Sequence, residues 1–308
     1  MRHHHTQTKG VNPAKVERVH PEVVVASYFL RWTMPQEAGG YTLQGYSRAA
    51  DTTGFLLPEL AWVLDAGVKV GSTRPEHIFL THTHSDHIHD LTFLKSRKKP
   101  PHIYVPAESA ELLERYFHVA QELTSHQVRD ESIPWTEAYR LNGVVGGDSF
   151  TIRRGGKTFK VKVVACDHTV PCVGYAFFEL RQKLKPEFAS LPGPEIGQLR
   201  RKGVAVTDEQ EIPLFAFLGD TTEQVFVRHP ELLNMPVVLV ECSFLDGKEY
   251  GERAAKTKHL VWDRLEPWVR CAPETTFVLT HFSHRYQEAD IHTFFDNIDC
   301  PNTIIWSR

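Results

Sequence analysis

The sequence lacks the features of a membrane-spanning or secreted protein. No apolar run approaches the roughly 18 to 20 residues of a transmembrane helix, and the N-terminus has no apolar signal core. The five cysteines are an odd number without a C-x-x-C pair, which is not the pattern of a secreted disulfide framework. We therefore expect a soluble cytosolic or nuclear protein, although basic, acid-free residues 1–15 leave an organellar address open.

The chain also lacks a strong charge of either sign. Its 35 Lys and Arg residues against 38 Asp and Glu residues give a net charge of −3, which excludes a globally basic nucleic-acid binder. An RNA partner would therefore need a local basic patch, although basic clusters are equally typical of a solvated surface. The candidate RNA contacts are Lys95, Arg97, Lys98, Lys99, Arg200, Arg201 and Lys202.

Length and composition are those of an ordinary globular protein. With 308 residues, 41% of them hydrophobic, the fold can bury a core without help from disulfides or a structural metal. Any metal site is therefore expected to be functional. We expect a flexible N-terminal extension over residues 1–20 and one domain over residues 21–308, with an excursion from the core at residues 181–208.

Short apolar or β-branched runs predict a β-rich chain with interspersed helices. The strand candidates are Val23–Leu30, Trp62–Leu64, His77–Thr81, His102–Val105, Phe159–Ala165, Val173–Leu180, Leu214–Leu218, Val237–Val240, Thr276–Thr280 and Thr303–Trp306. The helix candidates are Ala107–Leu123, with Leu112, Tyr116, Val119 and Leu123 on one side, then Ala254–Val269 and Arg285–Phe295. This order favours an α/β (α+β) fold of two packed sheets with helices outside.

A block of four potential metal ligands follows one of these strands. Residues 82–87 read His-Thr-His-Ser-Asp-His. On an extended strand end, His82 and His84 point to the same side and can bind one ion, whereas a following turn can direct Asp86 and His87 to a second. A single histidine is usually structural, but this spacing indicates a metal site.

Such a block leaves each ion short of ligands, and other strand ends supply them. His168, Asp220 and His281 each follow an apolar strand. The sequence predicts one ion bound by His82, His84 and His168, a second by Asp86, His87 and His281, and Asp220 bridging both. Imidazole-rich ligation favours zinc, with manganese or iron also compatible. Asp65 either orients one of these ligands or is a turn residue.

Several motifs in order resemble those of the metallo-β-lactamase superfamily and, more narrowly, short-form tRNase Z. Besides the metal block they are residues 168–175 (HTVPCVGY), 218–222 (LGDTT), 241–246 (ECSFLD) and 279–286 (LTHFSHRY). The resemblance implies an αββα sandwich, a homodimer and two zinc ions. It also implies removal of the 3′ trailer from precursor tRNA by a hydroxide that bridges the metals.

The same resemblance implies catalytic roles for Asp86, Glu241 and His259. In the family, the glutamate acts with a downstream histidine that protonates the departing 3′ oxygen. An ungapped match places Thr257 at that position, so His259 would have to fill it after a shift of two residues, or it caps a helix. Where the family commonly has two glycines after the metal block, residues 88–90 are Ile-His-Asp, which we expect to place bulk and charge at the site mouth.

Two alternatives stay open at this stage. Another hydrolase of the superfamily would act on a small phosphodiester or a thioester. An inactive RNA-binding relative would keep the fold without the chemistry.

Overall fold

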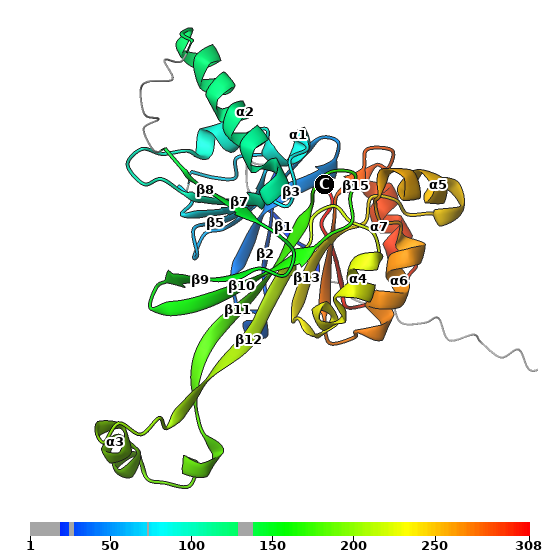
Figure 1. The fold of residues 1–308 in the computed structure, drawn as a ribbon. Coiled ribbons are helices and arrows are strands. Elements are labelled where there is room, and N and C mark those ends of the chain that lie inside the picture. Colours follow the sequence, from blue (N-terminus) through cyan, green and yellow to red (C-terminus); the bar gives the residue numbers. More distant parts are fainter. Residues whose placement is uncertain (1–18, 25–27, 73, 129–137) are drawn as a thin grey trace, which may run out of the picture.

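The computed structural model describes residues 19–308 apart from 25–27, 73 and 129–137. Most of the expected N-terminal extension therefore lies outside the described residues. Within them, the strands form two sheets that pack face to face, and helices cover the outer face of each sheet (Figure 1). The expected αββα sandwich is confirmed.

The first sheet runs in the order β1 to β8, with β15 paired to β3. Adjacent strands are antiparallel from β2 to β5 and parallel from β5 to β8. Its strands are β1 (Glu22–Val23), β2 (Leu30–Thr33), β3 (Thr42–Ala49), β4 (Thr52–Leu57), β5 (Trp62–Ala66), β6 (His77–Phe79), β7 (His102–Pro106), β8 (Arg140–Val144) and β15 (Phe282–Ser283).

The second sheet has the order β16-β14-β13-β12-β11-β10-β9. It is antiparallel from β9 to β12 and parallel from β12 to β16. Its strands are β9 (Ser149–Arg154), β10 (Lys157–Ala165), β11 (Val173–Leu184), β12 (Thr207–Phe217), β13 (Val237–Glu241), β14 (Thr276–Thr280) and β16 (Thr303–Ile305). In both sheets, the parallel strands bring their carboxyl ends to one edge.

The core between the sheets is aromatic. Trp62 and Phe79 of the first sheet pack against Phe159 and Phe177 of the second, with ring centroids 5.0 to 5.2 Å apart. Burial of each such side chain contributes roughly 1.5–3 kcal/mol. This core fixes the two sheets against each other and so fixes the edge at which their strand ends meet.

Helices cover the two outer faces, α1 and α2 on the first sheet and α4, α6 and α7 on the second (Figure 1). None of the described helices is long and apolar enough to cross a membrane. The helices are η1 (Gln36–Ala38), α1 (Ser85–Ile88), η2 (Leu91–Leu94), α2 (Ala107–Ser125), η3 (Pro186–Phe188), α3 (Gly193–Arg201), α4 (Gln224–Arg228), η4 (Pro230–Asn234), α5 (Gly247–Thr257), α6 (Trp262–Cys271) and α7 (Glu288–Asp296).

Helix α2 turns a different face to the sheet than its apolar spacing indicates. Leu113 and Phe117 are buried against the first sheet. The stripe of Leu112, Tyr116, Val119 and Leu123 is 38–78% exposed. Both sets repeat at helical spacing, and packing against the sheet selects one of them.

The expected helix over residues 254–269 is two helices. Helix α5 ends at Thr257, Lys258 adopts a left-handed φ of 53°, and α6 begins at Trp262. The sequence also missed β3, β4, β8 and β9, and the run Val23–Leu30 is divided between β1 and β2. The break after α5 matters for the site, because it carries His259.

Strands β11 and β12 extend beyond the body of the molecule as an antiparallel pair. The register pairs Leu184 with Thr207, and η3 and α3 lie between these residues. Figure 1 shows this segment, residues 181–208, projecting away from both sheets. We call it the arm.

Candidate metal centre

The histidine and aspartate residues singled out above meet at one edge of the sandwich. His82 and His84 follow β6 of the first sheet, whereas His168 follows β10, Asp220 follows β12 and His281 follows β14 of the second. These side chains come together because parallel strands end at the same edge and the two sheets are packed at that edge.

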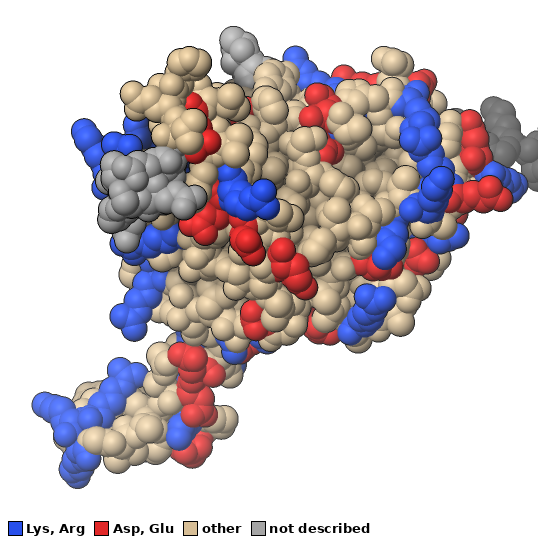
Figure 2. Space-filling model, turned by 45° about the horizontal axis from the view of Figure 1, so that its top comes forward, with Lys and Arg blue, Asp and Glu red and all other residues tan. Residues whose placement is uncertain are grey.

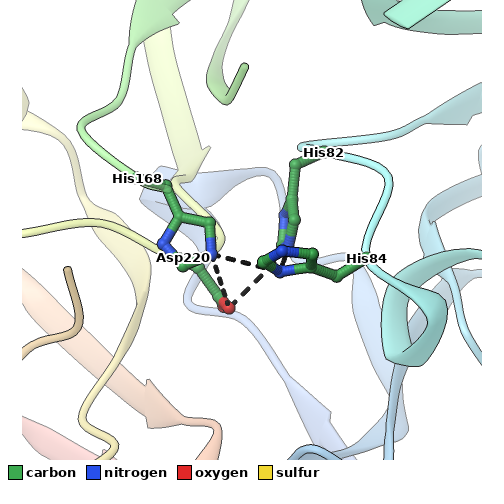
Figure 3. A group of neighbouring side chains, drawn as sticks. All are labelled: His82, His84, His168 and Asp220. Carbon is green, nitrogen blue, oxygen red and sulfur yellow. Dashed lines mark hydrogen bonds and ion pairs between the residues drawn. The ribbon is translucent and has the colours of Figure 1, made fainter. Parts of the chain in front are cut away.

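Three imidazoles form the first group of candidate ligands (Figure 3). His84 Nδ1 lies 3.1 Å from His82 Nε2 and 3.2 Å from His168 Nε2. Asp220 Oδ2 is 3.7 Å from both His82 Nε2 and His168 Nε2. All four ligand atoms lie within 4.8 Å of one another.

Asp86, His87 and His281 form a second group beside the first. The two Nε2 atoms are 3.3 Å apart, and Asp86 Oδ2 is 3.4 Å from His281 Nε2. Asp220 Oδ1 lies 3.5 Å from each Nε2. Asp220 therefore presents one oxygen to each group.

Hydrogen bonds below the site set which ring nitrogen carries the proton in His82 and His87. Thr81 Oγ1 donates its only proton to Asp65 Oδ2, so its 3.0 Å contact with His82 Nδ1 makes that nitrogen the donor. His87 Nδ1 donates to Asp65 Oδ2 at 2.7 Å. In the neutral imidazole, each Nε2 is left with a lone pair that faces the cluster.

The same argument holds for His168 and His281. His168 Nδ1 donates to the carbonyl of Lys258 at 3.1 Å. Ser243 Oγ donates to Glu241 Oε2 at 2.6 Å and therefore accepts from His281 Nδ1 at 3.0 Å. Both Nε2 atoms are thus also bare acceptors.

This donor set fits a divalent metal. Imidazole lone pairs that converge without protons between them attract a cation. Asp220 Oδ1 supports this reading, because it is buried and has no hydrogen-bond donor among the described residues. An ion is the partner that such an oxygen would gain.

Asp65 orients a candidate ligand, His87, rather than serving only as a turn. Its carboxylate is fully buried, accepts from the Thr81 amide at 2.7 Å and accepts the His87 and Thr81 side-chain protons. Burial raises the pKa of Asp65, although His87 and Thr81 oppose that effect. Asp65 lies within β5, near its carboxyl end, and has a left-handed φ of 52°.

Glu241 and His259 form a hydrogen-bonded pair next to the two groups. His259 Nδ1 lies 2.9 Å from Glu241 Oε1 and 3.8 Å from Asp220 Oδ2. Burial lowers the pKa of His259, but the neighbouring charges of Glu241 and Asp220 outweigh it and raise the pKa to about 9. Thr257 turns its hydroxyl back to the Arg253 carbonyl at 2.8 Å.

A cleft of about 560 Å³ opens above these residues. Sequence reasoning missed two cations that line it, Arg253 and Arg285. Arg285 was visible as part of the 279–286 motif, whereas Arg253 had no signal beyond its place on a polar helix face.

Asp86 also lines the cleft. Burial raises its pKa, but the hydrogen bond and charge of His281 and the charge of His87 lower it to about 2.

Residues 88–90, which stand where the family commonly has two glycines, do not fill the cleft. None of these residues lines it, and the His89 side chain is 75% exposed. Asp90 accepts from the Lys69 amide at 2.9 Å. The expectation of bulk and charge at the site mouth was therefore wrong, because these residues, at the end of α1 and just after it, lie outside the lining of the cleft.

The two basic clusters lie outside the cleft. Lys95 is half-buried, with its ammonium 4.7 Å from the Phe117 ring centroid, and it serves packing as much as charge. Arg97, Lys98 and Lys99 are exposed after η2, and Arg200, Arg201 and Lys202 are exposed on the arm. Figure 2 shows that basic side chains gather at the far end of the arm.

Comparison with known proteins places this chain in a family. A family described as Beta-lactamase superfamily domain matches residues 66–282. The structure is similar to the metallo-beta-lactamase fold protein YhfI from Bacillus subtilis, with a TM-score of 0.53 and 14% identity over 85% of this chain and 94% of that chain.

The curated relatives indicate one family within this superfamily. The chain is 30% identical to tRNase Z TRZ1 of Arabidopsis thaliana, over 82% of this chain and 89% of the relative. It is 29% identical to the chloroplastic tRNase Z TRZ2 of the same plant, over 83% of this chain and 71% of the relative. The chain thus belongs to the β-lactamase superfamily and, within it, to the tRNase Z family of metal-dependent hydrolases.

Proposed function

We propose that the chain is a zinc-dependent endoribonuclease that removes the 3′ trailer from precursor tRNA. The observation that carries this proposal is Asp220, whose two oxygens face two separate ligand groups at the floor of a cleft. Adjacent ligand groups of this kind suit the cleavage of a phosphodiester. The names of the relatives specify tRNA as the class of RNA.

The residues of the site would hold two zinc ions. His82, His84 and His168 would bind one ion, Asp86, His87 and His281 the other, and Asp220 both. Zinc would supply positive charge for the phosphate oxygens and would make water acidic enough to act as a nucleophile near neutral pH. Asp65, Lys258 and Ser243 keep the imidazoles in the tautomer that this binding needs.

His259 is the proton donor of this proposal. Glu241 is buried and occupies the Nδ1 side of the ring, so the remaining nitrogen, Nε2, is the one that can protonate a departing 3′ oxygen. Glu241 is itself fixed by the Thr221 amide at 2.8 Å and by Ser243. The pair is therefore held rigidly beside the candidate ligands.

Arg253 and Arg285 are the proposed phosphate contacts in the cleft. Arg285 lies over Tyr250, 5.5 Å from its ring centroid, and donates to Ser283 Oγ at 3.0 Å. A guanidinium fixed in this way can pair with a phosphate with little loss of side-chain freedom. These two arginines bring positive charge to a chain that is acidic overall.

The test is cleavage of end-labelled precursor tRNA by protein of known metal content. His259→Ala should lower turnover by about 10²- to 10⁴-fold, because it removes the proposed proton donor and leaves the seven proposed ligands in place. Thr257→Ala is the matched control, since it changes a cleft residue of the same segment at the ungapped family position. We expect both variants to retain the wild-type metal content.

Two outcomes would contradict this proposal. Equal turnover of wild type and His259→Ala would exclude His259 as the donor. Full zinc occupancy without cleavage of precursor tRNA would indicate another hydrolase of the superfamily. Hydrolysis of a small chromogenic phosphodiester does not separate these cases.

The proposal includes a homodimer formed through helix α2. Its exposed stripe repeats at intervals of four, three and four residues, which is the spacing of a two-helix seam. An antiparallel second copy would place Leu112 against Leu123 and Tyr116 against Val119 about a two-fold axis. Leu112→Glu should halve the mass measured by light scattering, whereas Val227→Glu, at an exposed apolar residue of α4, should not. A monomeric wild type would contradict this.

A cytosolic or nuclear location stays a prediction. It depends on the cysteine pattern, and one relative is named as chloroplastic.

A further inference from the structure

Two cysteines flank the loop that carries His168. The antiparallel register of β10 and β11 pairs Ala165 with Val173, and its next step sets Cys166 opposite Cys172. The Cys166 amide donates to the Cys172 carbonyl at 3.2 Å, so the pairing continues to these residues. Directly opposite residues of an antiparallel pair project their side chains from the same face.

The spacing of this pair suits a disulfide. Residues that share a backbone hydrogen bond in an antiparallel ladder have Cα atoms about 5.5 Å apart, and disulfides join Cα atoms about 4.4–6.8 Å apart. Both cysteines also line a cavity of about 390 Å³ beside the His168 loop. A small oxidant can therefore reach them without unfolding of the chain.

Both thiols hold the neighbouring loop that carries Asp220. Cys166 Sγ donates to the Leu218 carbonyl and Cys172 Sγ donates to the Asp220 carbonyl, each at 3.2 Å. Between these carbonyls, Gly219 makes a left-handed turn with a φ of 59°. The two thiols thus join the loop of one candidate ligand to the loop of another.

We propose that Cys166 and Cys172 are an oxidisable pair that forms an intramolecular disulfide with peroxide and thereby weakens metal binding. Hydrogen peroxide first oxidises the Cys166 sulfur, which gives a sulfenic acid and releases one water. The Cys172 sulfur then attacks it, the sulfur–sulfur bond forms, and a second water leaves. Two thiols and one peroxide thus give one disulfide and two waters.

Oxidation removes the two hydrogen bonds between the loops, because a disulfide sulfur has no proton to donate. The Leu218 and Asp220 carbonyls lose their thiol donors, and the turn at Gly219 loses its link to the His168 loop. Loss of such orienting hydrogen bonds commonly lowers metal affinity by about 10- to 100-fold. This consequence depends on the proposed metal site, whereas the disulfide itself does not.

The disulfide is tested first, on the full chain, without reference to metal or activity. A tryptic fragment over residues 163–181 contains both cysteines and no other. After peroxide treatment and digestion without reductant, this fragment should lose two hydrogen atoms and regain them with dithiothreitol. A fragment that gains only oxygen, or that is linked to Cys271, would overturn the proposal.

The effect on metal is tested with matched serine variants. Cys166→Ser keeps a donor for the Leu218 carbonyl but cannot form the disulfide, and Cys271→Ser removes an exposed thiol elsewhere. With zinc and a competing chelator, peroxide should lower the zinc affinity of wild type and Cys271→Ser about 10-fold or more, and that of Cys166→Ser not at all.

The outcomes separate the two proposals. A disulfide with unchanged zinc affinity would overturn the coupling between the pair and the site. Protein that binds no zinc before oxidation would contradict the proposed function instead, and the result for the tryptic fragment would stand.

Discussion

At the scale of single residues, the site is determined as much by the hydrogen bonds behind the imidazoles as by the imidazoles themselves. The Nδ1 protons of His87 and His168 are held by Asp65 and by the Lys258 carbonyl. A left-handed φ of 53° at Lys258 aims that carbonyl back at the ring. The site therefore depends on residues that are not themselves candidate ligands.

Asp65→Ala should be costly although Asp65 is not a ligand. It leaves the Thr81 amide, the Thr81 hydroxyl and His87 Nδ1 without their acceptor in a buried place, which costs about 3–5 kcal/mol of unfolding free energy. We also expect about 10- to 100-fold weaker zinc binding. Denaturant unfolding and chelator competition measure the two effects.

The matched control is Asp51→Ala, which removes an exposed carboxylate that pairs with Tyr46 and His284. It should change the unfolding free energy by less than about 1 kcal/mol. Equal losses for both variants would contradict an orienting role for Asp65.

Residue types and spacing indicated the seven candidate ligands, but among the residues behind them only Asp65 was named, and then with a turn residue as the alternative. Histidines and an aspartate at strand ends stand out in the sequence because the strands that precede them are strongly apolar. Ser243 and Thr81 do not stand out, since serine and threonine are common everywhere and their roles depend on partners far along the chain. The choice between Thr257 and His259 depended on the break between α5 and α6, which helical spacing did not show.

At the scale of elements, strand ends and tight turns position the site. The turn after β12 brings Gly219 against Thr81, where a Cβ built on the glycine would lie 2.6 Å from the Thr81 side chain. Because Thr81 is itself bonded to Asp65, it has no room to move aside. This turn is a close contact between the two sheets.

Gly219→Ala should therefore disrupt both stability and metal binding. The left-handed φ alone costs about 1–2 kcal/mol for alanine, and the contact with Thr81 adds to that. Gly203→Ala is the control, because Gly203 has a φ of 82° but open space around it. If both variants lose the same free energy in thermal unfolding, the contact with Thr81 has no effect.

The pairing of β6 with β7 makes stability sensitive to acid. His77 lies opposite His102, and burial, with the nearby His102, lowers the pKa of His77 to about 4. The unfolded chain takes up this proton near pH 6.5 and the folded chain only near pH 4. The contribution of His77 to the free energy of unfolding is therefore fully present above pH 6.5. It falls, by up to about 3 kcal/mol, as the pH drops toward 4.

This pH dependence is measured as a difference between proteins. His77→Gln should reduce the slope of unfolding free energy against pH between pH 6.5 and 4, whereas His89→Gln, an exposed control, should leave it unchanged. An unchanged slope in His77→Gln would mean that other groups cause the acid sensitivity.

The faces of helices were the least predictable elements. In α2, the exposed stripe and the buried pair of Leu113 and Phe117 are both apolar, so periodicity alone did not decide which one faces the sheet. Strands with weak alternation, such as β3 with its internal Gly45, were missed for a similar reason. The packing of the two sheets resolves what each local pattern leaves open.

At the scale of the whole molecule, positive charge is distributed in separate places. The cleft has Arg253 and Arg285, and the arm has a cluster of three basic residues, Arg200, Arg201 and Lys202, at its far end (Figures 1 and 2). A long, folded RNA can contact both places at once, whereas a small substrate contacts only the cleft. The distribution therefore favours a macromolecular substrate.

Charge reversal separates the two basic clusters. Changing Arg200, Arg201 and Lys202 to glutamate should weaken precursor tRNA binding and reduce its dependence on salt, by about 0.7–0.9 in log–log slope for each phosphate that the variant no longer neutralises. Glutamate substitutions at Arg97, Lys98 and Lys99 test the second cluster in the same way, for comparison with the arm. Binding and salt dependence that stay unchanged in both would indicate that these clusters are only solvated surface.

The long separation of the ligands along the chain has a consequence for synthesis. His87 and His281, whose Nε2 atoms are 3.3 Å apart, are 194 residues apart in sequence. At a synthesis rate of about 5–20 residues per second, His281 leaves the ribosome roughly 10 to 40 s after His87. A nascent chain therefore has the first four candidate ligands long before a complete site exists, and truncated products lack it altogether.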